Sequence, residues 1–134
     1  RWTARAVPGR LRGMPTLERL GILTCDRVRD HLAAAHGEYP AMFERLFERE
    51  RPTLELVEYA VHAGEFPAHL DDCDAYLITG SRHSVYEPEP WIRRLEAYVR
   101  ELHAARKRTI GICFGHQMMG LALGGNSARA PQGW

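Results

Sequence analysis

The chain has 134 residues, 45% hydrophobic and 26% charged, which is enough for one globular domain with a buried core. Its formal net charge of +1 excludes a globally basic protein that binds nucleic acid through its overall charge. No apolar stretch approaches the roughly 20 residues needed to cross a bilayer, so neither nucleic acid nor a membrane is expected as a partner.

Residues 1–13 form a basic leader or tail that we expect to be disordered. The segment holds four arginines and no acidic residue, so the rest of the chain is net acidic. It lacks the apolar core of a signal peptide and precedes Met14, a candidate start. A short targeting peptide and an upstream extension or added tail are the alternatives. Residues 14–134 are assigned to one domain.

The first half of the chain predicts two strands and a helix between them. Residues 20–25 form a buried apolar run that ends at Asp26. A helix is expected to begin at Pro40, with one apolar face made of Met42, Phe43, Leu46 and Phe47. Residues 54–59 alternate apolar and polar side chains, which indicates a second strand, and residues 64–67 break it.

The second half predicts two more strands, each followed by a turn. Residues 75–79 form a third strand that closes at Gly80. A helix over residues 90–106 is indicated by apolar side chains at steps of three and four: Trp91, Ile92, Leu95, Tyr98, Val99 and Leu102. Residues 109–113 form a fourth strand, and a last helix runs from there to Gly124.

Strands separated by helices predict parallel pairing with right-handed crossovers, and hence an α/β fold with a doubly wound, mostly parallel sheet. In such sheets the reactive groups gather at the carboxyl ends of the strands. Cys113 ends the fourth strand and Gly80 follows the third, so we expect the two to converge on one site.

The run over residues 109–120 is the most informative part of the sequence. An apolar strand leads into Gly111-Ile112-Cys113-Phe114-Gly115 and then directly into a helix-forming stretch, which is the layout of a nucleophile elbow built on cysteine. A nucleophile on so sharp a turn takes a strained conformation, and Gly111 and Gly115 remove side chains that would collide. The first amides of the helix favour the reactive thiolate at Cys113.

A single cysteine in an apolar strand is more often a small buried hydrophobic residue, but the flanking glycines, strand and helix favour a functional Cys113. Cys25 and Cys73 lack this context and are interpreted as structural. The three cysteines make neither a disulfide framework nor a metal-ligand spacing, which fits a reducing cytoplasm. No cofactor and no metal are expected.

The run Gly-Ile-Cys-Phe-Gly-His-Gln resembles the nucleophile motif of the class I glutamine amidotransferases, and residues 77–81 resemble the oxyanion-loop segment of that family. The resemblance extends over residues 17–134. It implies a flavodoxin-like fold and hydrolysis of the glutamine side-chain amide to glutamate and ammonia. An ammonia-accepting synthetase is then an expected partner.

By this resemblance Cys113 is the nucleophile and forms a γ-glutamyl thioester. The amides of Phe114 and Gly80 are the candidate oxyanion donors. Gly80 lacks a Cβ atom, which would allow close approach, although an ordinary turn glycine is the alternative. Gln117 is expected to hold the substrate, with a solvated helix position as the alternative.

The loop over residues 81–90 is expected to lie over the site, with Ser81 binding substrate, or to be a plain solvated connection. His116 directly follows the elbow glycine, but its backbone turns into the helix. The general base of the family comes from elsewhere, so His116 is not expected to be the base.

The sequence departs from the family pattern at the general base. The His-x-Glu pair of the family lies well downstream of the nucleophile, whereas every histidine in the printed sequence precedes Cys113 or adjoins it. We therefore expect a chain cut within its domain, inactive by itself, and poorly stable or self-associating.

Two classes of function remain open from the sequence. The first is the nucleophile-bearing part of a glutamine amidotransferase-like enzyme. The second is a non-catalytic α/β binding module with a vestigial elbow. Other cysteine-elbow proteins, such as the DJ-1/PfpI-like proteins or an esterase-like hydrolase, are a third reading, and the glutamine after Gly-His favours the amidotransferase over these.

Overall fold

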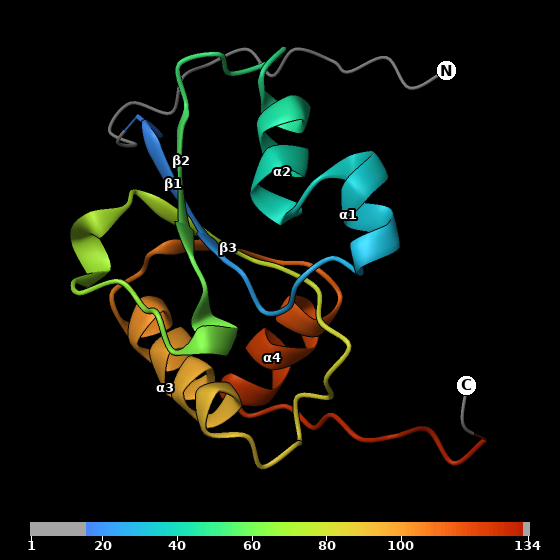
Figure 1. Ribbon diagram of the computed structural model, residues 1–134. Coiled ribbons are helices and arrows are strands. Elements are labelled where there is room, and N and C mark those ends of the chain that lie inside the picture. The colour runs from blue at the N-terminus through green and yellow to red at the C-terminus, as the bar shows by residue number, and fades with distance from the viewer. Residues whose placement is uncertain (1–15, 133–134) are drawn as a thin grey trace, which may run out of the picture.

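The computed structural model describes residues 16–132. The described chain alternates strands and helices along most of its length (Figure 1). The elements are β1 (Arg19–Leu23), α1 (Asp30–His36), α2 (Tyr39–Phe47), β2 (Glu55–Tyr59), the short 3-10 turns η1 (Val61–Ala63) and η2 (Leu70–Asp72), β3 (Ala75–Ile78), α3 (Pro90–Ala104), β4 (Arg108–Gly111) and α4 (Phe114–Ala122). The basic segment 1–13 lies outside the described residues.

The four strands form one sheet in the order β2-β1-β3-β4, and every neighbouring pair is parallel. The central strands β1 and β3 pair from Leu20 with Ala75 to Leu23 with Ile78. Because all strands run in one direction, their carboxyl ends meet at one edge of the sheet. The predicted doubly wound α/β fold is therefore confirmed.

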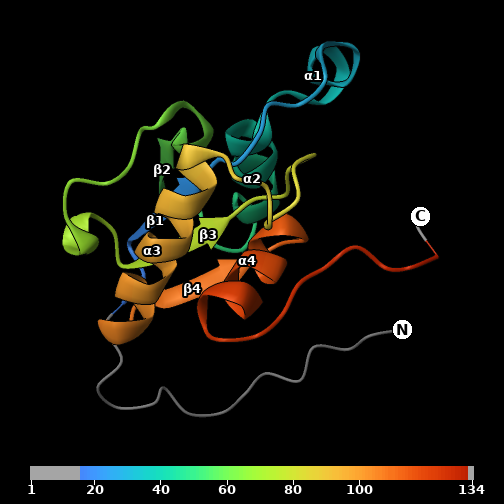
Figure 2. The ribbon, with the colours of Figure 1, turned by 90° about the horizontal axis from the view of Figure 1, so that it is seen from below.

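Helices cover both faces of the sheet, with α2 on one side and α3 and α4 on the other, while α1 stands away from the sheet beyond α2 (Figures 1 and 2). On the second side a large core includes Leu23, Tyr76 and Ile78 of the strands with Phe114 and Met118 of α4. On the first side a smaller core gathers Leu20, Ile22, Ala75 and Leu77, against which Phe43 and Phe47 pack. Each central strand thus alternates its side chains between two cores.

The helix predicted from residue 90 is present as α3, with Pro90 in its first turn. Its apolar stripe is the predicted one, since all but Trp91 of the expected positions are buried: Ile92, Leu95, Tyr98, Val99 and Leu102. Trp91 is partly buried against the same core. The periodicity of the apolar residues was enough to predict this helix, because the apolar stripe is continuous over four turns.

Other predictions were wrong in detail. Helix α1 was not predicted, because Asp30–His36 has no apolar stripe and buries no residue. Only half of the apolar face expected in α2 is buried: Phe43 and Phe47 pack on the sheet, while Met42 and Leu46 are exposed. Strands β1 and β4 end before Cys25 and Cys113, so both cysteines lie in the turns that follow.

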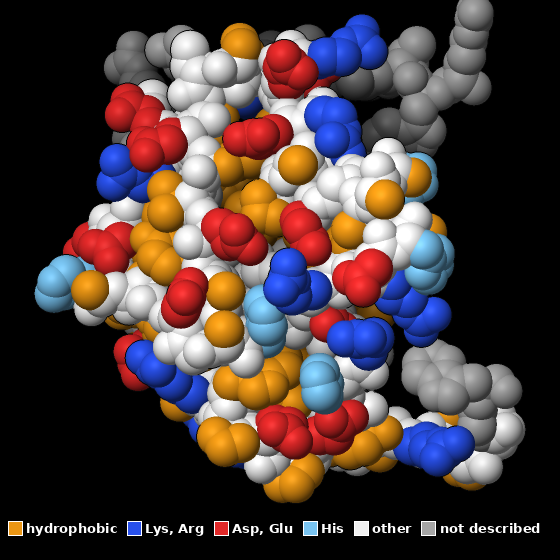
Figure 3. Space-filling model, viewed as in Figure 1, with side chains coloured by type: hydrophobic (Ala, Val, Ile, Leu, Met, Phe, Trp, Pro, Cys, Tyr) orange, Lys and Arg blue, Asp and Glu red, His pale blue; other side chains and the backbone are white. Residues whose placement is uncertain are grey.

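The strand β4 forms one edge of the described sheet, which explains why its apolar side chains are less buried than the sequence suggested. Ile110 is 52% exposed, and Ile112, just beyond the strand, is 41% exposed. The face shown in Figure 3 carries acidic and basic side chains interspersed, with no continuous basic surface. Within residues 16–132, no helix is both long and apolar enough to cross a membrane.

Helix α4 packs on β3 with no space for a side chain at Gly115. A Cβ atom built there would lie 2.4 Å from the carbonyl oxygen of Ile78, whereas one at Gly120 of the same helix would meet nothing within 4 Å. We expect Gly115→Ala to destabilise the fold by about 1–3 kcal/mol, the usual cost of overpacking. Gly120→Ala, the matched control, is expected to be neutral or stabilising by up to about 1 kcal/mol. Urea unfolding measures both changes, and equal midpoints for the two variants would contradict the predicted close packing.

Candidate active site

Cys113 lies at the turn between β4 and α4, as the elbow motif predicts. It is the residue that caps the N-terminus of α4, and its backbone has φ +50° and ψ −105°. A positive φ is costly for a residue with a side chain and persists only where the surroundings enforce it. Cys113 is exposed, whereas Cys25 and Cys73 are buried.

The two glycines of the elbow are required sterically. A Cβ atom at Gly111 would lie 2.5 Å from the carbonyl carbon of Gly115 and 2.6 Å from the amide nitrogen of His116. One at Gly115 would collide with Ile78 of β3. The first glycine therefore lets the chain fold back over itself, and the second lets α4 begin directly on the sheet.

Gly80 follows β3 and lies beside the elbow. Its ideal Cβ position is 3.9 Å from the Cβ of Cys113, and the amide of Ile112 donates to the carbonyl of Ile78 at 3.0 Å. In the described part of the chain, no hydrogen bond engages the amides of Gly80 or Phe114. Both predicted donors are thus free. A Cβ atom at Gly80 would make only an ordinary contact with Cys113, so no described residue by itself requires a glycine at this position.

An open cleft of about 430 Å³ adjoins the thiol. It brings together Cys113, Gly80 and Ser81 with the loop after β1, and is lined by Asp26, Arg27, Val28, Arg29, Leu32, Tyr39, Gly80, Ser81, Arg82, Ile112 and Cys113. Gln117 is exposed on α4 and lines a different cavity, of about 170 Å³, together with Ser84 and Tyr86. The structure therefore places Ser81 in the same cleft as Cys113, and Gln117 in a different hollow.

The sequence interpretation missed an ion pair that lines this cleft, between the buried carboxylate of Asp26 and the largely exposed side chain of Arg82. Asp26 is 6% exposed and accepts hydrogen bonds from the Arg82 side chain at 2.9 and 3.0 Å. Burial alone would raise the pKa of Asp26, but the hydrogen bonds from Arg82 and from the Arg27 amide outweigh it, and the net pKa is lowered. The position of Asp26 shortly after a buried strand could have marked it as a candidate site residue, but not its pairing with Arg82.

None of the described residues that line the cleft of Cys113 is a histidine. His83 lies in the loop after β3, where its Nδ1 is 2.7 Å from Oε2 of Glu87 and its ring makes a T-shaped contact with the ring of Trp91. His116 is exposed on the first turn of α4. Within residues 16–132, no three histidine, cysteine or acidic side chains are grouped to hold a metal ion.

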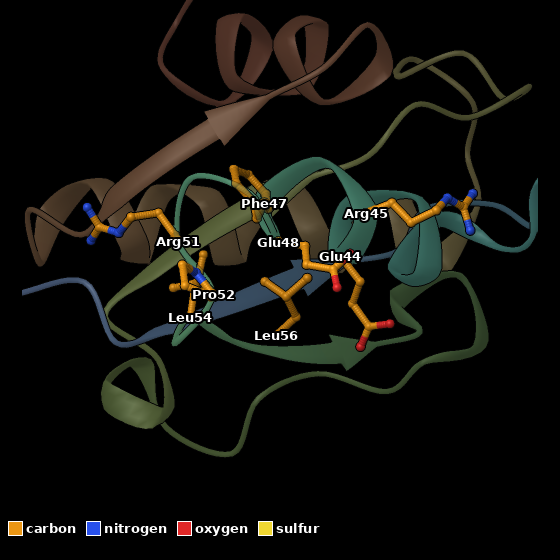
Figure 4. Close-up of a pocket in the computed structure, with 8 residues that line it drawn as sticks. All are labelled: Glu44, Arg45, Phe47, Glu48, Arg51, Pro52, Leu54 and Leu56. Carbon is orange, nitrogen blue, oxygen red and sulfur yellow. The ribbon is translucent and has the colours of Figure 1, made fainter.

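A separate hollow of about 320 Å³ lies between α2 and the segment that leads into β2 (Figure 4). Phe47, Pro52, Leu54 and Leu56 give it an apolar floor, and its rim carries charged side chains. It shares no residue with the cleft of Cys113. It is therefore not part of the candidate active site.

An exposed cysteine at a strained strand-to-helix turn, on the carboxyl edge of a parallel sheet, defines the class of α/β proteins with a cysteine nucleophile elbow. The family described as "Glutamine amidotransferase class-I" matches residues 39–133. The chain belongs to this family, and its fold is flavodoxin-like.

Relatives and solved structures agree with this assignment. "Gamma-glutamyl peptidase 4" of Arabidopsis thaliana is 34% identical over 73% of this chain and 39% of its own length. "Putative glutamine amidotransferase YLR126C" of Saccharomyces cerevisiae is 32% identical over 89% of this chain and 53% of its own length. A crystal structure of a glutamine amidotransferase from Methylobacillus flagellatus superposes with a TM-score of 0.64 at 25% identity, covering 87% of this chain and 43% of that one. The chain thus spans about half the length, or less, of these proteins.

The environments of the three thiols predict selective alkylation. Burial raises the pKa of the Cys25 thiol to about 12 and also raises the pKa of Cys73, whereas Cys113 is exposed. With limiting iodoacetamide at neutral pH, Cys113 is expected to be labelled at least tenfold faster than the others, as read by peptide mass mapping. In 8 M urea the three rates should become similar, as a control. Preferential labelling of Cys25 or Cys73 in the folded chain would contradict the prediction that Cys113 is the reactive thiol of the elbow.

The lowered pKa of Asp26 predicts a pH-dependent contribution to stability. A carboxylate with a depressed pKa in the folded state stabilises above the unfolded pKa, about 4, and the stabilisation is lost as pH falls through the folded pKa. The difference in unfolding free energy between the wild type and Asp26→Asn should therefore be largest at pH 5–7 and shrink below pH 4. Urea unfolding at pH 7, 5 and 3 measures it. A difference that is the same at all three values would show that the charge of Asp26 is unimportant.

Proposed function

We propose that this chain carries the nucleophile of an enzyme that hydrolyses the side-chain amide of glutamine, or the equivalent γ-glutamyl amide bond of a peptide. The observation that carries the proposal is the exposed Cys113 thiol at φ +50°, at the N-terminus of α4 and beside Gly80. The names of the relatives support both substrates, since some are γ-glutamyl peptidases and others glutamine amidotransferase-like proteins.

The reaction follows from the chemistry of a thiolate. The sulfur of Cys113 attacks the γ-carbonyl carbon, a C–S bond forms, and the carbonyl oxygen takes the negative charge. When the tetrahedral species collapses, the C–N bond breaks and the nitrogen leaves with a proton, as ammonia or as the amine of a peptide. Water then attacks the γ-glutamyl thioester, which releases glutamate and returns the thiolate.

The oxyanion is assigned to the amides of Phe114 and Gly80. Phe114 is the first residue of α4, so its amide points out of the helix N-terminus, where the partial positive charge of the helix favours an anion. Gly80 approaches from β3 on the other side. Two preorganised donors of this kind typically account for about 10²- to 10³-fold each in rate.

The substrate is proposed to lie across Cys113, between Ser81 in the cleft and Gln117 in the neighbouring hollow. Support for this arrangement is that Ser81 lines the cleft of Cys113, while Gln117 lines a second hollow and lies on the first turns of the helix that begins after Cys113. An ammonia-accepting synthetase remains a proposed partner for the glutamine reaction. Hydrolysis of a γ-glutamyl peptide would require no such partner.

A general base is needed to remove the thiol proton and deliver a proton to the leaving nitrogen. No histidine lines the cleft among the described residues, and His83 is engaged by Glu87. We therefore propose that the 134 residues alone are inactive, and that the family's downstream His-x-Glu pair supplies the base.

This proposal is tested by glutamate release from glutamine and from γ-glutamylglycine. The 134-residue chain is expected to turn over at least about 10²-fold more slowly than a protein extended with the downstream His-x-Glu region, the usual worth of general acid–base assistance. Cys113→Ser in both proteins is the control. Equal, Cys113-dependent turnover by the short chain would show that an upstream histidine is the base. An extended protein with no Cys113-dependent turnover would favour a non-catalytic binding module.

A further inference from the structure

The carboxylate of Asp26 is fully engaged, mainly by one residue. Its Oδ2 accepts from the backbone amide of Arg82 at 2.8 Å and from Nε at 2.9 Å, and its Oδ1 accepts from Nη2 at 3.0 Å. The Arg27 amide donates to Oδ1 at 2.8 Å. A carboxylate this buried is tolerated when its lone pairs are saturated, yet such a pair is weak evidence of a gain in stability. What the pair does fix is the position of the Arg82 backbone.

The chain is anchored again three residues earlier. Thr79 is completely buried, its amide donates to the carbonyl of Leu23 at 3.1 Å, and its Oγ1 accepts from the amide of Cys25 at 2.9 Å. These bonds continue the pairing of β1 with β3 past the ends of both strands. The turn after β3 is therefore tied to β1 at Thr79 and at Arg82.

Only Gly80 and Ser81 lie between the two anchors. Gly80 is next to Cys113, with its ideal Cβ position 3.9 Å from the cysteine Cβ, and its amide makes no hydrogen bond within the described chain. A segment of two residues held at both ends has few accessible conformations. The anchors consequently determine where the Gly80 amide points relative to the thiol.

We propose that Asp26, acting through the backbone amide and guanidinium of Arg82, is a positioning residue for the oxyanion donor at Gly80. The inference rests on the proposed function, because it concerns the same thiol and the same acyl transfer. Asp26 does not touch the reacting atoms. A misplacement of about 1 Å remote from the chemistry can cost about 10²-fold in rate, so loss of the anchor should slow formation of the tetrahedral species.

Two reagents separate this effect from thiol reactivity in general. p-Nitrophenyl acetate acylates Cys113 through an oxyanion: the thiolate attacks the ester carbonyl, a C–S bond forms, and the C–O bond breaks as p-nitrophenolate leaves with the electron pair. Iodoacetamide alkylates the same thiol by displacing iodide at a saturated carbon, with no oxyanion. The ratio of the two rates at Cys113 therefore reports the oxyanion donors and not the exposure or ionisation of the thiol. Neither reaction needs a histidine base.

The experiment measures both rates in the wild type, Asp26→Asn, Arg82→Lys and Glu55→Gln, with Cys113→Ser as the background. Glu55 pairs with Arg19 at 2.9 Å at the opposite end of β1, which makes it the matched control. We expect the acylation-to-alkylation ratio to fall at least tenfold in Asp26→Asn. Arg82→Lys keeps the positive charge and the hydrogen bond from the backbone amide to Asp26, but it loses the contact of two guanidinium nitrogens with the carboxylate. In this variant the fall in the ratio should be smaller. Glu55→Gln should leave the ratio unchanged.

The outcomes distinguish the inference from the proposed function. A ratio in Asp26→Asn within twofold of the wild-type value, while wild-type Cys113 is acylated, would overturn the positioning role alone. Parallel losses of both rates would also overturn it, since they indicate general damage to the turn. If wild-type Cys113 is alkylated but never acylated, the proposed acyl transfer fails, and the inference fails with it. Should Asp26→Asn not fold, as judged by circular dichroism, an unchanged ratio in Arg82→Lys is the decisive contrary result.

Discussion

The contact between α4 and β3 at Gly115 is the constraint on which the site depends. With 2.4 Å between an ideal Cβ at Gly115 and the carbonyl oxygen of Ile78, the helix can begin on the strand only because that Cβ is absent. Cys113 falls between the end of β4 at Gly111 and the start of α4 at Phe114, in neither the strand nor the helix. The thiol is therefore pushed out at the carboxyl edge of the sheet, beside the turn that follows β3.

The strain at Cys113 is maintained by bonds on both sides of it. The Ile112 amide donates to Ile78, and the Gly115 amide donates to Ile112, so the residues flanking Cys113 have their positions fixed by the sheet and by the turn itself. A strained conformation costs on the order of 1–3 kcal/mol and survives only when the surrounding structure determines it. Here the surrounding structure includes Gly111 and Gly115, where no side chain would fit, and the buried side chain of Phe114.

The two proposed substrates, glutamine and a γ-glutamyl peptide, would present the same carbonyl group to this thiol, and they differ in the nitrogen that leaves. In the proposed function, the described residues that act on the shared half of the reaction are the Cys113 thiol, the amides of Gly80 and Phe114, and the anchored turn. The proposal is compatible with relatives named for either substrate. The choice between ammonia and an amine product belongs to the residues that contact the leaving nitrogen.

The sequence by itself determined the elements with strong local patterns and the chemistry of the elbow. The stripe of α3 and the spacing of Gly111, Cys113 and Gly115 are local, because each depends on residues within a few turns of one another. Only the tertiary structure showed that β4 lies at an edge of the described sheet and that Ile110 is exposed. The hydropathy of a strand does not indicate which strands will pair with it. It alone showed that Gln117 and Ser81 line different hollows, and that Asp26 binds a residue 56 positions away. Such pairings arise from the parallel crossover that brings β1 beside β3, and no local pattern in the sequence encodes them.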